Sequence, residues 1–228
     1  MRVCALSDLH GYLPTLKPCD IVLICGDVIP LDIQIKSKES EAWFKGIFAD
    51  WINKLPCDTV FMVAGNHDFY LEHINNRKNK IKETLFDPTN GKLVYLNGLT
   101  SGGVIYGKYL IWGTPFCKIF NKWAFMRSED ILRERYELMP DNCDIVLSHD
   151  SPMFNGLGVL GEKWNYLDAG NPILTSVILN KKPKYFFSGH LHEGNHKFQE
   201  VDGINCANVS ILNDDYEVVY EPLYFDIN

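Results

Sequence analysis

Five short apolar runs, each ending at a small residue, constrain the fold of this 228-residue chain more than any other feature of its sequence. Runs of three to five apolar or β-branched residues, bounded by small or polar ones, are typical of strands buried on both faces of a sheet. The five runs lie at 3–6, 21–25, 60–64, 145–147 and 185–187. We therefore expect a buried strand at each of them.

Two segments between these runs have helical spacing. In the first, 40–55, the apolar residues Trp43, Ile47, Trp51 and Leu55 recur every four positions, and Ser40 is the predicted N-cap. The second helix is predicted at 128–138.

Segments 92–112 and 204–225 resemble hairpins, because glycine or Asn-Asp turns separate their apolar stretches. Strands that alternate with helices early in the chain, followed by hairpins, predict an α/β protein. We expect two mixed β-sheets packed face to face with flanking helices. The glycine-rich segment 151–172 is long for a loop in a compact domain, and loops of this length are usually either functional or mobile.

The length, composition and net charge of the chain disfavour several classes of protein. A length of 228 residues with 46% apolar residues fits one domain over 1–228. The net charge of −7 disfavours a protein that holds extended nucleic acid through its phosphates. Asp8 and His10 interrupt the apolar start of the chain, so we expect neither an export signal nor membrane association. Seven cysteines without a C-x-x-C spacing favour reduced thiols and a cytoplasmic location.

Each of the five predicted strands is followed by residues that can bind metal. Sites in such sheets form at the carboxyl ends of the strands, where loops from different strands converge. The residues found there, in chain order, are Asp8 and His10, Asp27, Asn66 with His67 and Asp68, His149, and finally His190 and His192. In an extended segment, His190 and His192 point to the same side.

This donor set is too large for one tetrahedral zinc ion. Two divalent ions bridged by a carboxylate would use it fully. Oxygen and imidazole donors without thiolate favour manganese, with iron, zinc, cobalt or nickel as alternatives.

The motifs D-x-H, G-D, G-N-H-D, H and G-H-x-H occur in this order between residues 8 and 192. In this the chain resembles the calcineurin-like metallophosphoesterase superfamily. The stretches "IWGTPF", "GHLHEG" and "CANVSILNDDY" are similar to those of its small uncapped branch, whose members act on cyclic nucleotides and other phosphodiesters. The resemblance implies a four-layer sandwich of helices, two sheets and helices.

The resemblance also implies roles for individual residues. Asp8, His10 and His192 would hold one metal ion; Asn66, His149 and His190 would hold the other. Asp27 would bridge the two ions. His67 would be a general acid that protonates the leaving group, and Asp68 would orient it.

Two departures from the family pattern concern the substrate. Asp150 stands after the fourth-block histidine, where the branch commonly has a small residue. It would either place an extra carboxylate beside the second metal or accept hydrogen bonds from the amides of a turn. Asp27 is followed by Val28 without the nearby arginine of the protein phosphatases, which disfavours a protein phosphatase. Large aromatic residues outside the motifs are expected to pack in the core or in loops rather than to form a platform on which a base stacks; these are Trp112, Phe116, Trp123, Trp164 and Tyr166.

The sequence favours a phosphodiesterase for small substrates such as cyclic nucleotides, in which a metal-bridging hydroxide attacks phosphorus. The alternatives are a nuclease for polynucleotide ends, a phosphomonoesterase, and a binding scaffold without catalysis. The acidic balance weighs against the nuclease, and the complete donor set weighs against the scaffold. The expected partner is a small phosphodiester, and the oligomeric state is left open.

Overall fold

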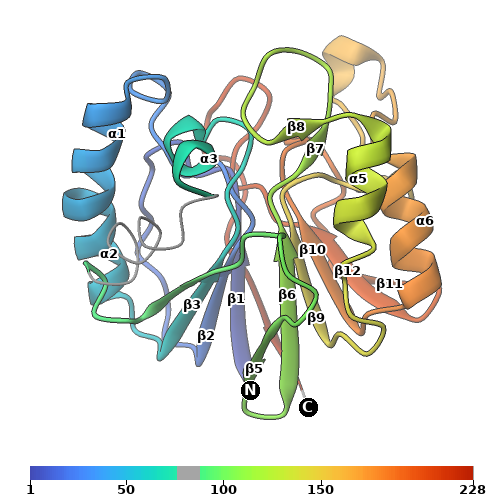
Figure 1. Ribbon diagram of the computed structural model, residues 1–228, viewed down its shortest axis with the longest axis horizontal. Coiled ribbons are helices and arrows are strands. Elements are labelled where there is room, and N and C mark those ends of the chain that lie inside the picture. Colours follow the sequence, from blue (N-terminus) through green and yellow to red (C-terminus); the bar gives the residue numbers. More distant parts are fainter. Residues whose placement is uncertain (76–87, 228) are drawn as a thin grey trace.

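Two mixed β-sheets lie face to face at the centre of the computed structural model, which describes residues 1–75 and 88–227 (Figure 1). The first sheet has the strand order β13-β1-β2-β3-β4. Its strands are β1 (Arg2–Leu6), β2 (Ile21–Ile24), β3 (Thr59–Met62), β4 (Leu93–Tyr95) and β13 (Leu223–Asp226). Strands β1 to β4 run parallel, and β13 pairs antiparallel with β1.

The second sheet has the order β11-β12-β10-β9-β6-β5. Its strands are β5 (Val104–Tyr106), β6 (Tyr109–Thr114), β9 (Ile145–Ser148), β10 (Tyr185–Ser188), β11 (Gln199–Val201) and β12 (Ile204–Asn208). The four inner strands are parallel, whereas β5 and β11 are antiparallel edges. A short parallel pair, β7 (Cys117–Lys118) and β8 (Met126–Arg127), lies above this sheet in Figure 1. The predicted architecture of two mixed sheets is confirmed.

Helices cover both outer faces (Figure 1). One side carries α1 (Ser37–Trp43), a π-helical turn (Phe44–Phe48), α2 (Ala49–Lys54) and α3 (Phe69–Asn75). The other carries α5 (Glu129–Tyr136) and α6 (Pro172–Lys181), and a 3₁₀ turn spans Glu162–Trp164. In the described part of the chain, none of these helices has the length and apolar character that crossing a membrane requires.

Alternation along the strands divides the core into layers. In β1, Val3 and Ala5 belong to the apolar cluster shared by both sheets, together with Ile145 of β9 and Phe187 of β10. Cys4, between them, belongs to the cluster that includes the helices. Successive side chains of a strand point to opposite faces, so a run without polar residues is required to fill both layers.

The helix predicted at 40–55 begins earlier, at Ser37, and Ser40 is not its N-cap. The Ser40 hydroxyl lies inside the helix and donates a hydrogen bond of 2.9 Å to the Ile33 carbonyl. The four-residue apolar spacing does not mark one buried face, because the Ile47 side chain is 60% exposed. The π-helical turn inserts an extra residue, and Phe44 and Phe48 face the core in its place.

The predicted second helix is confirmed as α5, which begins directly after Ser128. The two predicted hairpins are only partly correct. Within 92–112, β5 and β6 form a hairpin, but β4 pairs with β3 in the other sheet. The tail segment likewise divides, since β12 pairs with β10 and β11 while β13 returns to β1. Pairing with distant strands, which local turn signals do not encode, decides both cases.

Candidate metal centre

The predicted metal ligands all lie where a parallel strand ends. Leu6, Ile24 and Met62 are register partners across β1, β2 and β3, so the three strands end level with one another. Phe187 of β10 and Leu147 of β9 are paired in the same way. The loops that follow carry the seven predicted ligands to one edge of the two sheets: Asp8, His10, Asp27, Asn66, His149, His190 and His192.

The first group of donors comes from both sheets. Asp8, His10 and His192 each offer an atom, and these atoms lie within 4.8 Å of one another. His192 Nε2 is 3.4 Å from Asp8 Oδ1. Both ring nitrogens of His10 are buried without a hydrogen-bond partner in the described residues. A buried imidazole without partners is costly, and a metal ion would give it one.

The second group is centred on Asp27. Donor atoms of Asp8, Asp27 and His149 again lie within 4.8 Å of one another. Asp27 Oδ2 is 3.4 Å from His149 Nε2 and 3.7 Å from His10 Nε2, so this carboxylate faces both groups. Asn66 Oδ1 is 2.9 Å from the same His149 nitrogen. The ring of His190 lies beside this group, with its centre 5.0 Å from that of His149.

Backbone carbonyls orient two of the imidazoles. His149 Nδ1 is 2.8 Å from the Cys25 carbonyl oxygen, and His192 Nδ1 is 2.8 Å from that of Asn213. A carbonyl accepts only from a protonated nitrogen, so each ring presents an unprotonated Nε2 to the site when it is neutral. This arrangement is the one that metal-binding histidines adopt in proteins.

The charge balance also fits a cation. Asp8 and Asp27 are buried, and within residues 1–75 and 88–227 their only ion-pairing neighbours are histidines. Although burial acts in the opposite direction, contact with His192 lowers the pKa of Asp8 to about 2. Asp27 likewise raises the pKa of His149 to about 10, although burial of the imidazole acts to lower it. The carboxylates therefore attract positive charge strongly, and the donor set fits two divalent ions.

Backbone strain is concentrated at these residues. The φ angles of Asp8, His10, Asp27 and His190 are 58°, 41°, 52° and 68°, in the left-handed region that side chains other than glycine rarely adopt. Each such residue costs about 1–3 kcal/mol. Strain at four of the seven predicted ligands indicates that the loops are shaped for a function rather than for stability.

Two glycines let the loops approach one another closely. A Cβ at Gly189 would lie 2.1 Å from Ser7 Oγ and 2.4 Å from Asp8 Oδ2. A Cβ at Gly65 would lie 2.2 Å from Asp27 Oδ1. No other residue fits at either position unless a predicted ligand moves.

His67 lies at the edge of the ligand groups, and its Nε2 is 4.0 Å from Asp27 Oδ2. Its Nδ1 is 2.5 Å from Gln34 Oε1, an acceptor, so Nδ1 carries the proton in this contact. Nε2 is thereby left to face the site. Gln34 lies in a turn before α1 without a sequence pattern, and we did not predict it.

Asp68, expected to orient His67, has other contacts. Its carboxylate accepts hydrogen bonds from the backbone N–H groups of Val28, Ile29 and Gly65 at 3.1, 3.0 and 2.8 Å. Burial and the nearby Asp27 raise the pKa of Asp68 to about 7. Asp68 thus joins the loops after β2 and β3. The side chain that forms a hydrogen bond with the His67 ring is that of Gln34.

Asp150 turns away from the ligands. One oxygen accepts from the Ser151 N–H at 3.0 Å; the other accepts from Asn171 Nδ2 at 2.7 Å and from the Lys118 N–H at 3.1 Å. Of the two roles left open for Asp150, these contacts support the bonding of loop amides, and they make Asp150 a buried anchor for the two ends of the 151–172 segment.

A cavity of about 470 Å³ opens beside the ligands, and we call it the metal-side cavity. Asp27, Asn66, His190 and His192 form part of its wall. Lys118 lines it too, with its ammonium 2.9 Å from the Gly170 carbonyl oxygen. Lys118 lies outside the motifs, and no sequence pattern marks it.

Aromatic rings complete the wall of this cavity. Trp112 and Phe116 are buried in the core as expected, but Trp123 and Trp164 line the metal-side cavity. Phe120 and Tyr216, which the sequence analysis did not single out, line it as well.

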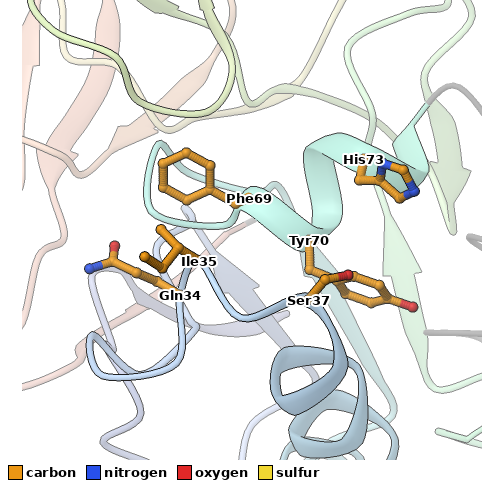
Figure 2. Close-up of a pocket in the computed structure, with 6 residues that line it drawn as sticks. All are labelled: Gln34, Ile35, Ser37, Phe69, Tyr70 and His73. Carbon is orange, nitrogen blue, oxygen red and sulfur yellow. The ribbon is translucent and has the colours of Figure 1, made fainter.

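A smaller cavity of about 230 Å³ lies on the α3 side of the site. Figure 2 shows the residues that line it: Gln34, Ile35 and Ser37 lie around the start of α1, and Phe69, Tyr70 and His73 belong to α3. Gln34 therefore lines this cavity while its amide oxygen contacts His67.

Comparisons with known proteins agree with this geometry. A family model described as calcineurin-like phosphoesterase matches residues 1–194. The human metallophosphoesterase domain-containing protein 1 is 24% identical over 246 residues, which cover 99% of this chain and 71% of that protein. The lariat debranching enzyme of Schizosaccharomyces pombe is 25% identical, over 96% of this chain and 55% of its own length.

A solved structure provides a comparison of the fold. The phosphopantetheinyl hydrolase from Mycobacterium tuberculosis superimposes with a TM-score of 0.55 at 15% identity, over 94% of this chain and 90% of that one. At this identity the likeness concerns the fold alone.

Proposed function

Because this chain belongs to the calcineurin-like phosphoesterase family, whose members are metal-dependent hydrolases of phosphoric esters, we propose that it hydrolyses phosphodiester bonds in small substrates such as cyclic nucleotides. The observation that carries the proposal is the position of His67, a proton donor at the rim of two groups of metal ligands. A diester needs both an activated water and a proton for the departing oxygen.

The ligands divide as their positions suggest. Asp8, His10 and His192 would hold one ion, and Asn66, His149 and His190 would hold the other. Asp27, which faces both groups, would bridge the ions. When bound, two such ions activate a water and neutralise charge on the phosphoryl oxygens. The nitrogen and oxygen donors favour manganese, with iron, zinc, cobalt and nickel as alternatives.

The protein's own part in the reaction is to deliver a proton and hold the ester. Gln34 fixes the His67 ring through Nδ1, so Nε2 of the protonated ring can donate to the leaving oxygen. Asp68 supports this step indirectly, because it fixes the loop on which His67 lies. Asp68 is therefore a positioning residue.

The charge of the metal-side cavity favours a diester over a monoester. Among the lining residues that the structure describes, Lys118 is the only lysine or arginine. Its ammonium is already bonded to the carbonyls of Ala169 and Gly170. A dianionic monoester would lack the bidentate arginine contact that such groups commonly receive, whereas a monoanionic diester needs less compensation.

A nuclease that acts on polynucleotide ends is the second candidate. It is favoured by the relative named lariat debranching enzyme. The net charge of −7 weighs against it, because extended nucleic acid binds through phosphate contacts with a basic face.

Purified protein loaded with manganese tests the proposal on a panel of 3′,5′-cyclic nucleotides, bis-p-nitrophenyl phosphate, p-nitrophenyl phosphate and single-stranded DNA. We expect kcat/KM to be higher for bis-p-nitrophenyl phosphate than for p-nitrophenyl phosphate, and cyclic nucleotides to be cleaved. Metal analysis should give two ions per chain. A higher kcat/KM on the monoester, or cleavage of DNA alone, would overturn the proposal.

A further inference from the structure

The metal-side cavity has an aromatic wall that metal binding does not explain. Four rings line it: Phe120, Trp123, Trp164 and Tyr216. From their arrangement we infer that this wall is a subsite for a flat aromatic ring of the substrate, namely a nucleobase. The inference rests on the proposed function and names the part of the substrate that the protein recognises.

The ring of Trp123 packs against that of His67, the proposed proton donor. Its ring centre is 4.4 Å from that of His67, with 35° between the planes. The following residue, Ala124, donates its backbone N–H to the Asn66 carbonyl at 3.0 Å. This wall is therefore fixed to the loop that carries both a metal ligand and His67, and a group bound against Trp123 lies beside the ester.

The polar edge of Trp123 is free for a ligand. Trp51 and Trp112 donate their indole N–H groups to the carbonyls of Pro14 and Thr100. Within the described ranges, the Trp123 indole N–H has no protein acceptor, and the residue is only half-buried. The side chain thus offers a ring face and an unpaired donor, the two groups with which proteins hold a base.

Tyr216 lies over the opposite part of the site in a strained conformation. Its ring meets those of His10 and His192 edge-on, at 5.0 and 5.3 Å between centres, and that of His67 at 6.4 Å. Its φ angle is 62°, which is unfavourable for a bulky side chain.

The turn that carries Tyr216 is tied to the metal ligands. The Asn213 carbonyl accepts both the Tyr216 N–H at 3.0 Å and His192 Nδ1 at 2.8 Å. Glycine would adopt this conformation without strain. The tyrosine is nevertheless 43% exposed. Unlike other exposed rings, it lies against His10 and His192 and lines the metal-side cavity, so a ligand bound there would contact it.

Aromatic rings suit a base better than an acyl chain, which would be matched by branched aliphatic side chains. Stacking of one base on a protein ring changes affinity by about 5- to 150-fold. The expected ligand is thus a nucleotide whose phosphate lies at the metals and whose base lies against Trp123 and Tyr216.

Calorimetric titration of the manganese-loaded protein tests this inference without requiring turnover. Adenosine 5′-monophosphate and ribose 5-phosphate share the phosphate and the sugar and differ only in the base. We expect the nucleotide to bind about 5- to 150-fold more tightly. Trp123→Ala should remove most of this difference and change ribose 5-phosphate binding by less than twofold, while Trp123→Phe should retain the preference. Tyr166→Ala, an exposed ring of the same region outside the cavity wall, is the control and should change neither affinity.

Tyr216→Gly separates a ligand contact from a structural role. If the ring is held for the ligand, this variant keeps or raises Tm because strain is relieved, yet binds adenosine 5′-monophosphate more weakly. A fall in Tm with unchanged nucleotide affinity would overturn the assignment of Tyr216.

Further outcomes distinguish a failure of the base subsite from a failure of the proposed function. Equal affinity for the nucleotide and the sugar phosphate, or tighter binding of octyl phosphate than of the nucleotide, would overturn the base subsite even if diesters are cleaved. A base preference that depends on Trp123, in a protein that cleaves no diester, would support the subsite and refute the proposed function.

Discussion

Replacing Gly189 by alanine should disable the metal centre through one methyl group. The added Cβ would lie 2.1 Å from Ser7 Oγ and 2.4 Å from Asp8 Oδ2, whereas ordinary contacts begin at 3.4 Å. The backbone or the Asp8 carboxylate must therefore move by about 1 Å. A ligand displaced by this amount no longer meets the distance tolerance of about 0.2 Å that metal sites require.

The expected effects can be given magnitudes. Overpacking of this kind costs about 1–3 kcal/mol of folding stability, which for a chain of this size lowers Tm by about 2–12 °C. A misplacement of about 1 Å at an active site costs on the order of 10² in rate. We therefore expect kcat/KM on bis-p-nitrophenyl phosphate to fall at least that far, and the metal content to fall below two ions per chain.

Gly46→Ala is the matched control, because nothing lies within 4 Å of a Cβ at Gly46 in the π-helical turn. This substitution should leave metal content and rate unchanged and stabilise the helix by about 0.5–1 kcal/mol. Mass-spectrometric metal analysis, thermal unfolding and initial rates would be measured for both variants. A Gly189→Ala protein that holds two ions with full activity would refute the assignment of Asp8 as a ligand.

Further substitutions test the other parts of the site. Asp27→Asn should bind fewer than two ions and lose activity, since one carboxylate faces both ligand groups; metal analysis that still finds two ions would contradict the bridging role. His67→Ala should slow cyclic nucleotide hydrolysis by about 10² to 10⁴ with normal metal content, and should affect nitrophenyl diesters far less, because nitrophenolate leaves without a proton. Equal losses on both substrates would mean that His67 positions phosphate. Gln34→Leu should show the same substrate dependence at about tenfold, and metal loss in this variant would refute its action through His67. Asp150→Asn should lower stability by about 1–3 kcal/mol with metals retained, measured by urea unfolding; an unchanged midpoint would contradict its role as an anchor.

The strand ends and the residues after them were predictable from the sequence, because buried parallel strands have a strong local signature. Five apolar runs placed Asp8, Asp27, Asn66, His149 and His190 at one edge of the sheets, and the structure brings them there. Strand pairing was less predictable, since β4 and β13 join strands far away in the chain.

The side-chain contacts that complete the site could not be predicted from the sequence. Gln34 reaches His67 across 33 positions of the chain, and no local pattern marks it. The family resemblance implied that Asp68 orients His67, yet in the structure the Asp68 carboxylate accepts hydrogen bonds from the backbone groups of Val28, Ile29 and Gly65. The unfavourable φ angle of Tyr216 is seen only in the structure, because the residues around it in the sequence are typical of a polar turn.

The division of the ligands between two sheets has a practical consequence for fragment assembly. The link at Ser101–Gly102 is exposed and lies between β4 of one sheet and β5 of the other. Cutting there separates the ligands into two sets: Asp8, His10, Asp27 and Asn66 before the cut, and His149, His190 and His192 after it. Neither piece alone could hold an ion with its full coordination. Divalent metal ions would therefore promote association of the two fragments. A split reporter, with one half fused to each fragment, would detect metal binding through this association.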